Sequence, residues 1–402
     1  MKSVRQTDIL GDIMVRVAVV RCPDYEAASL AVSVGRAFGL LGGLEAFVPR
    51  RAKVFIKINH LSPPSPPEAA IVTHPALAAA VIKRLKELSD DIIVGDDIHS
   101  PEADGFRLSG YRDLVRRFGI RLVNLREEGF REAPTRGRRL PAVHVSPLVL
   151  ESDVLINLPK FKTHAFTAFT GSVKNMFGAI PHGRRLEAHR RFPRQDDFAE
   201  MLVDVYGLRI PDLTVMDAVT VMEGKGPAGG TPRPAGLILA SSDGVAVDAV
   251  AAELAGFPRS GILTTALARG RGFGVGDLEG IEIVGERLRD VALSNFEPSA
   301  VASGLIKKRL PAAVYAFVSG QLIYLPRVEA ERCTGCGECL RSCPTGAARP
   351  DGEKARIEKR ACIGCMCCHE VCRFRAIRLR RKGLGRLISG GGKLLRRLGV
   401  RV

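Results

Sequence analysis

The chain has 402 residues, with 60 Lys and Arg against 43 Asp and Glu, no Trp and few aromatic residues. This length exceeds one ordinary compact core and predicts two domains with mainly aliphatic packing. No uninterrupted apolar stretch reaches membrane-spanning length, and Asp8, Asp12 and Arg16 interrupt any region that resembles a signal peptide. These features argue against a membrane-spanning or secreted protein, and we expect a cytoplasmic one.

The net charge of +17 is concentrated at the C-terminus, because the segment from Arg373 to Val402 holds eleven Lys and Arg and no acid. Such a block suits an acidic protein or an anionic membrane surface. We therefore expect the tail to contact an acidic partner protein, with peripheral membrane contact as a further option. Only Phe374 could stack on a base there, which disfavours nucleic acid.

In chain order, short apolar runs alternate with amphipathic segments. Strands are predicted at 15–21, 53–58, 91–95, 121–125, 154–158, 214–216, 237–240 and 281–284, and helices at 25–44, 75–88, 111–118 and 248–254. We expect Thr73 to cap the helix at 75–88. This alternation predicts an α/β domain at 1–300, with a mostly parallel sheet flanked by helices. A connector at 301–325, a small, cysteine-rich α+β domain at 326–382 and a basic tail at 383–402 complete the prediction.

Polar residues follow the carboxyl ends of successive predicted strands. They are Lys57 and Asn59, Asp96 and Asp97, Asn157 and Lys160, Asp217, and Asp243. Open α/β sheets bind ligands in the crevice at that edge. Each residue alone could be a helix cap or a solvated charge, but the set favours a ligand site.

The densest polar stretch runs from Asn157 to Arg185. Lys160, Lys162 and His164 alternate in an expected extended loop, which would place them on one side. Gly171 and Ser172 read as a helix N-terminus with free N–H groups, an arrangement that attracts phosphate or carboxylate. An ordinary capped helix is the alternative.

These observations give two sets of candidate residues in the crevice. His164 is the candidate for proton transfer because its ordinary pKa is near neutral, and Lys160 and Asp97 are further catalytic candidates. The candidates for binding an anionic small molecule are Lys57, Asn59, Lys162, Gly171, Ser172, Lys174, Asn175, Asp217 and Asp248. Asp97, Asp217 and Asp248 could instead hold a metal or orient a lysine.

The C-terminal cysteines form two repeats of the pattern Cys-x-x-Cys-x-x-Cys-x-x-x-Cys. In bacterial ferredoxins the fourth cysteine of each such run ligates the other cluster. We therefore predict two 4Fe-4S clusters, which makes the domain at 326–382 a ferredoxin-type domain. One is assigned to Cys333, Cys336, Cys339 and Cys372, and the other to Cys362, Cys365, Cys368 and Cys343.

The other uses of cysteine fit this pattern less well. A zinc site has no need of a third closely spaced cysteine, and disulfides require an oxidising compartment. Cys367 is extra and is interpreted as a spare thiol. The second repeat has Arg373 where Pro344 follows the first, and this charge could raise a cluster potential.

Several of these segments resemble the family called domain of unknown function 362, whose members often carry a C-terminal two-cluster ferredoxin domain. They are the segments 56–59, 158–164 and 170–175, together with Asp243 and Asp248. The resemblance implies an iron–sulfur protein, with no activity that can be transferred.

The combined expectation is an iron–sulfur electron-transfer protein, in which the clusters exchange electrons with an anionic substrate or cofactor in the α/β crevice. That would make it a ferredoxin-coupled oxidoreductase, with an electron donor or acceptor protein as its partner. Two alternatives remain open: a non-enzymatic electron carrier that docks on a partner, and a non-redox enzyme with structural clusters.

Overall fold

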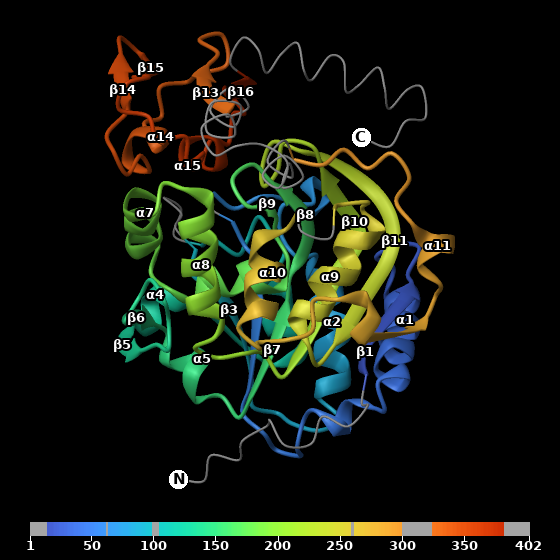
Figure 1. Ribbon diagram of the computed structural model, residues 1–402. Helices are drawn as coiled ribbons and strands as arrows, with labels where there is room; N and C mark the ends of the chain where they lie inside the picture. The colour runs from blue at the N-terminus through green and yellow to red at the C-terminus, as the bar shows by residue number, and fades with distance from the viewer. Residues whose placement is uncertain (1–13, 62, 99–103, 259–260, 300–323, 382–402) are drawn as a thin grey trace.

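The computed structural model describes residues 14–61, 63–98, 104–258, 261–299 and 324–381. They form a large α/β body and a small C-terminal unit, coloured orange to red, which lies above one end of the body (Figure 1). The predicted basic tail and nearly all of the predicted connector lie outside the described residues. No helix within these ranges combines the length and apolar character that a bilayer crossing needs.

The body is built on one large mixed sheet. Its strands run in the order β12 (Ile281–Gly285), β1 (Val15–Arg21), β11 (Thr231–Ser241), β10 (Leu213–Glu223), β7 (Val154–Leu158), β2 (Val54–Ile58), β3 (Ile92–Asp96) and β4 (Arg121–Asn124). β8 (Lys160–His164) pairs in parallel with β10 and antiparallel with β9 (Ala168–Phe169). On the main path only β11 is antiparallel to its neighbours. The predicted α/β fold with a mostly parallel sheet is confirmed.

Alternate residues of each strand pack against helices on opposite faces of the sheet. On β1, Ala18 and Val20 pack with α1 (Ala27–Leu40) and α2 (Pro75–Leu85), whereas Val17 and Val19 pack with α9 (Gly244–Leu254). α8 (Gln195–Tyr206) and α10 (Leu263–Gly270) share the face of α9. Burying strands on both faces explains their nearly continuous apolar sequences.

The remaining elements of the body are short and connect or cover these layers. They are α3 (Arg112–Phe118), α4 (Leu125–Glu128), the pair β5 (Arg131–Pro134) and β6 (Ala142–Val145), α5 (Pro147–Glu151), α6 (Ser172–Asn175), the 3₁₀ turn Met176–Ala179, α7 (His182–Arg191) and α11 (Leu288–Val291).

Two predicted helix starts were wrong. His74, not Thr73, caps α2, since its Nδ1 accepts a hydrogen bond from Ala76 N, while the Thr73 hydroxyl donates to Leu158 O. α9 begins at Gly244, four residues earlier than predicted, because Asp243 caps it through the N–H groups of Val245 and Ala246.

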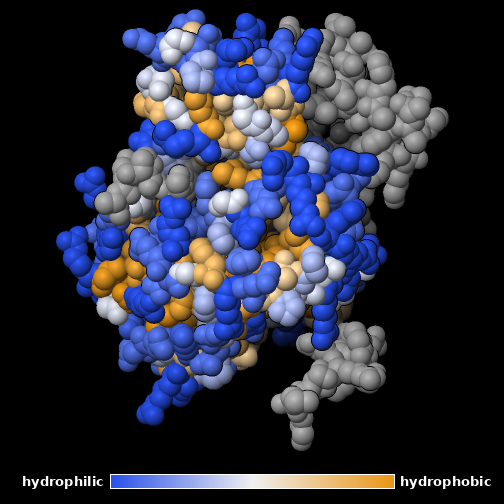
Figure 2. All heavy atoms as spheres, turned by 90° about the vertical axis from the view of Figure 1, so that its left-hand side faces the viewer, coloured by the Kyte–Doolittle hydropathy of each residue, from blue (hydrophilic) through white to orange (hydrophobic). Residues whose placement is uncertain are grey.

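The small unit consists of two strand pairs and two one-turn helices. They are β13 (Tyr324–Val328) with β16 (Ile377–Arg381), β14 (Ala348–Asp351) with β15 (Lys354–Ile357), α14 (Glu338–Arg341) and α15 (Cys367–Glu370). In Figure 2 the unit has a hydrophilic top, and its apolar side chains gather lower down, toward the body. Met366 and Leu379 pack with Ala165 of the body, and His369 Nε2 lies 3.4 Å from Lys225 O.

Candidate functional site

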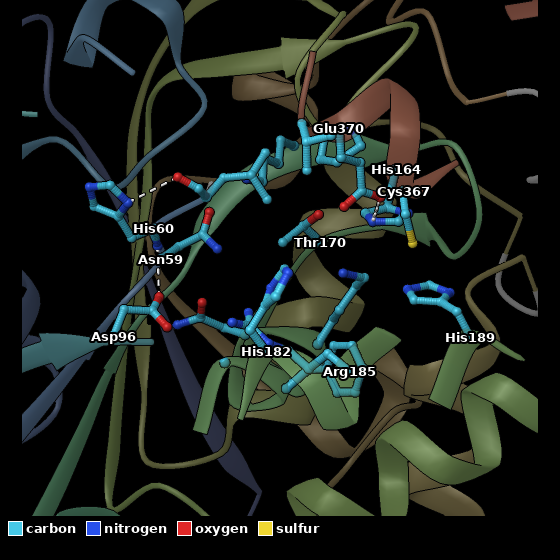
Figure 3. A pocket seen from close by; sticks show the side chains of 18 of the residues that line it. Asn59, His60, Asp96, His164, Thr170, His182, Arg185, His189, Cys367 and Glu370 are labelled. Atoms are coloured by element: carbon cyan, nitrogen blue, oxygen red, sulfur yellow. Dashed lines mark hydrogen bonds and ion pairs between the residues drawn. The ribbon is translucent and has the colours of Figure 1, made fainter. Parts of the chain in front are cut away.

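A cavity of about 90 Å³ lies at the carboxyl edge of the sheet, beneath α15 (Figure 3). Asn59 and Asp96, at the ends of β2 and β3, line one side of it, and Cys367 and Glu370 of α15 line another. The edge that the sequence indicated is therefore a crevice, and the small unit forms part of its wall.

Two of the candidate lysines form ion pairs inside the body. Lys57 Nζ lies 2.8 Å from Asp96 Oδ2 and donates to Ile58 O, and Lys160 Nζ lies 2.7 Å from Asp217 Oδ2. Tyr25 completes the second pair, since its hydroxyl donates to Asp217 and accepts from Lys160. All four charged groups are buried. The expectations that Lys160 is catalytic and that Lys57 and Asp217 bind a ligand find no support in this geometry.

Lys162, Lys174 and Arg185 do line the cavity. Lys162 is 1% exposed and donates to Ile71 O at 2.6 Å. Burial lowers the pKa of its ammonium to about 7, and the charge of Lys174 lowers it further. Arg185 pairs with Asp97 at 2.7 Å, which occupies the carboxylate that was a catalytic candidate. The cavity wall therefore carries three basic side chains beside the carboxylates of Asp96, which pairs with Lys57, and Glu370.

His164 lies in the crevice, but its hydrogen bonds do not suit proton transfer. Its Nδ1 accepts from the backbone N–H groups of Phe166 and Thr167, so the proton of the neutral ring is on Nε2, which lies 3.2 Å from Glu370 Oε1. Burial lowers the pKa of this imidazole to about 4. With its only lone pair engaged, neutral His164 has no free nitrogen to act as a base, and its Nε2 lies near Glu370 without forming a hydrogen bond to it.

The expected anion site at the start of α6 was wrong. The N–H groups of Ser172 and Val173 donate to the two carboxylate oxygens of Asp248, at 2.6 and 3.1 Å. A Cβ on Gly171 would lie only 2.1 Å from Asp248 Oδ1, so glycine permits this close approach. Asp248 thus caps α6 from inside α9 and leaves these donors unavailable to a ligand.

Asn157 and Asn175 form a relay whose orientation is fixed by a backbone carbonyl. Asn157 Nδ2 donates to Ser172 O, so its Oδ1 faces Asn175 and accepts from Nδ2 of that side chain at 2.7 Å. The remaining atom, Asn175 Oδ1, is buried without a partner among the described residues, as is Asn59 Oδ1. Both asparagines line the cavity and present acceptors to a ligand.

The aspartates do not form a metal site. Asp97, Asp217 and Asp248 are each engaged separately, with Arg185, with Lys160 and with backbone N–H groups. Among the described residues, none of these aspartates belongs to a group of three side chains that could hold a single metal ion.

The cysteines fall into the two predicted quartets. Cys333, Cys336, Cys339 and Cys372 line one cavity, and Cys343, Cys362, Cys365 and Cys368 line another. Burial raises the pKa of the Cys339 thiol to about 11, and repulsion from Cys372, Cys336 and Cys333 adds to the rise, as expected for four sulfurs facing one space. Backbone N–H groups of Ala347 and Ala376 donate to the sulfurs of Cys343 and Cys372. Four convergent thiols with N–H···S bonds fit a 4Fe-4S cluster.

Sequence reasoning missed the contribution of α15 to the crevice. Cys367, interpreted as a spare thiol, lines the cavity beside Glu370 (Figure 3). Although burial alone would raise the pKa of Glu370, His164 and Lys174 lower it to about 2. The only signal in the sequence was the position of both residues beside the ligand candidate Cys368.

Two comparisons concern solved structures, the lactate racemase apoprotein from Thermoanaerobacterium thermosaccharolyticum and a protein from Thermotoga maritima. Their identities are 12% and 14%, and their TM-scores 0.39 and 0.38. The matches cover 61% and 58% of this chain and only 57% and 60% of those structures.

The sequence comparisons are more specific. Residues 325–373 match the 4Fe-4S dicluster domain, so the small unit is a 4Fe-4S ferredoxin-type domain. A thylakoid-associated protein of Synechocystis sp. is 34% identical over 240 residues, which cover 59% of this chain and 74% of that protein. Residues 54–253 match the family described as domain of unknown function (DUF362). The chain belongs to this family.

Proposed function

We propose that the protein is a ferredoxin-coupled oxidoreductase, in which two 4Fe-4S clusters exchange electrons with a small anionic molecule in the crevice. One observation carries this proposal: α15 both contains a cluster-ligand candidate, Cys368, and forms a wall of the cavity. Cys368 belongs to the second cysteine quartet, while its neighbours Cys367 and Glu370 line the crevice. A ligand there would lie beside the second cluster.

The cysteines of the two quartets differ in exposure, and this difference gives the proposed electron transfer a direction. Cys336 of the first quartet is exposed, whereas Cys365 and Cys368 of the second are buried. We assign the first cluster to exchange with an external protein and the second to exchange with the crevice. Arg327 and Arg380 lie on the strand pair β13–β16 beside Arg378, which pairs with Glu329, and the two would favour an acidic carrier.

The anionic character of the ligand follows from the charges that face the cavity. Lys162 and Lys174 have no carboxylate within ion-pair distance in the described part of the chain, and Arg185 Nε has no hydrogen-bond partner there. A buried cation without a counter-ion, such as Lys162, is costly, and an anion would offset that cost. Arg185 is already paired with Asp97, and Glu370 balances part of the charge of Lys174. Thiolate-bound clusters also favour a reducing compartment, so we place the protein in the cytoplasm.

The test uses anaerobically purified, pre-reduced protein and a panel of small organic and inorganic anions, with cluster oxidation followed by absorbance. A true ligand should oxidise the clusters, and Lys174→Ala should slow this at least tenfold at low ligand concentration. Lys83, exposed on α2, gives the matched control Lys83→Ala. Wild-type rates in a cluster-replete Lys174→Ala variant would refute the proposal.

A further inference from the structure

Three lysines of the body are almost completely buried, and one of them differs from the other two. Lys57 and Lys160 each have an aspartate partner, at 2.8 and 2.7 Å. Lys162 has only the carbonyl oxygen of Ile71, and no carboxylate among the described residues lies within ion-pair distance of it. It is also the one of the three that lines the cavity.

An ammonium ion in this position lacks the compensation that buried charges require. The desolvation of an unpaired buried ammonium costs several kcal/mol, so the group instead releases its proton. Burial lowers the pKa of Lys162 to about 7, and the charges of Lys174 and Lys160 act in the same direction. The carboxylates of Glu370 and Asp96 oppose this shift from a greater distance. A desolvated lysine beside another cation is a recognised way to obtain a neutral, nucleophilic amine near neutral pH.

The surroundings of Lys162 are complementary to a particular kind of partner. Lys174 and the unpartnered Nε of Arg185 can hold an anionic group in the same cavity. Asn175 Oδ1, held in place by the Asn157 relay, is an acceptor for a hydroxyl group. The volume of about 90 Å³ restricts the partner to a small molecule.

We propose that Lys162 forms a Schiff base with a small carbonyl compound that carries an anionic group, such as a 2-oxo acid. The Nζ lone pair attacks the carbonyl carbon to form a C–N bond, and a proton passes from nitrogen to the former carbonyl oxygen. The resulting carbinolamine loses that oxygen as water and leaves an imine, with no net oxidation or reduction. This inference names the ligand class of the crevice and rests on the proposed function.

The test is reductive trapping in the intact, cluster-loaded protein. The protein is incubated anaerobically with glyoxylate, pyruvate or 2-oxoglutarate and sodium cyanoborohydride, and the modified lysine is located by peptide mass spectrometry. At least one acid should label Lys162, with half-maximal labelling near pH 7, and excess sulfate should suppress it. Lys160 lies two residues away and is equally buried but paired, so it is the internal control and should stay unlabelled.

A variant separates nucleophilic from merely electrostatic roles. Lys162→Arg keeps the positive charge and removes the amine, so it should abolish the adduct while anion binding, measured by calorimetry, is retained. Wild-type protein that binds these acids yet shows no adduct at Lys162, or only labelling of surface lysines, would overturn the inference. Cluster oxidation by a crevice ligand without any adduct would refute the Schiff base and leave the proposed redox function standing. An adduct at Lys162 without any cluster response would support the Schiff base and contradict the redox function.

Discussion

Lys160 and Lys162 share one strand and one degree of burial, so their different partners should have opposite consequences for stability. Lys160→Met leaves the buried Asp217 without its counter-charge, so we expect the free energy of unfolding to fall by about 3–5 kcal/mol. Lys162→Met removes a buried amine whose desolvation is unfavourable, together with its hydrogen bond to Ile71 O. The two effects oppose each other, so the free energy of unfolding should change by less than about 1 kcal/mol. Thermal denaturation of the two anaerobic variants checks this pair. Equal losses would mean that Lys162 has a buried counter-charge.

The depressed pKa of Lys162 also predicts how the crevice responds to pH. A non-carbonyl anion such as sulfate binds the ammonium form, which predominates below about pH 7. Its affinity should therefore fall as the pH rises, by roughly twentyfold between pH 6.5 and 8.5, because the ammonium fraction of a group with a pKa of about 7 falls by about that factor. Calorimetry across this range measures the slope. In Lys162→Met the slope should disappear, and a slope that persists would assign it to another group.

The sequence located these lysines but could not tell them apart. All three lie in polar segments that follow or form predicted strands, which is why they were grouped as one site. Their roles depend on strand register, since Lys160 lies opposite Asp217 in the pairing of β8 with β10. That pairing joins residues more than fifty positions apart, and no local pattern reports it. The Lys160–Asp217 ion pair, which the sequence did not predict, removes Lys160 from the cations available to a ligand.

At the scale of elements, α6 shows how a glycine motif can be misread. Its N-terminus matched the pattern of an anion site, yet Asp248 from the adjoining α9 already accepts from both leading N–H groups. The predicted start of α9 at residue 248 hid this contact. The helix begins at Gly244, so Asp248 lies within its second turn and not at its start. The cap holds α6, and with it Lys174 and Asn175, in the wall of the crevice.

Loss of this cap should weaken both stability and ligand binding. Asp248→Ala orphans two buried N–H groups, so we expect a loss of about 1–3 kcal/mol. Asp248→Asn keeps one acceptor and should lose less. Thermal denaturation gives the stability, and anion calorimetry reports the position of Lys174. If Asp248→Ala instead bound anions more tightly at unchanged stability, the N-terminus of α6 would be a ligand site after all.

At the scale of the whole molecule, the repeats predicted a ferredoxin-type unit but not where it lies. The spacing of cysteines is a local property, and the 4Fe-4S dicluster domain was recognisable from it alone. The position of α15 over the crevice depends on long-range contacts, those of Met366 and Leu379 with Ala165 and of Glu370 with His164. Gly229 permits this approach, since a Cβ there would lie 2.6 Å from His369 Cε1. Two separately predictable parts thus combine into a site that neither contains alone.

This arrangement predicts that the two exchanged ligands, Cys372 and Cys343, have unequal roles. Cys372→Ser should disrupt the first, more exposed cluster and leave the second cluster, beside the crevice, intact. Cys343→Ser should disrupt the second cluster and leave the first intact. Iron content should fall in both variants. In each reduced variant, electron paramagnetic resonance reports the remaining cluster before and after a crevice anion is added. The anion should alter the spectrum of Cys372→Ser and leave that of Cys343→Ser unchanged, because only the second quartet adjoins the cavity wall. The reverse pattern would place the crevice beside the first cluster and reverse the direction of the electron path.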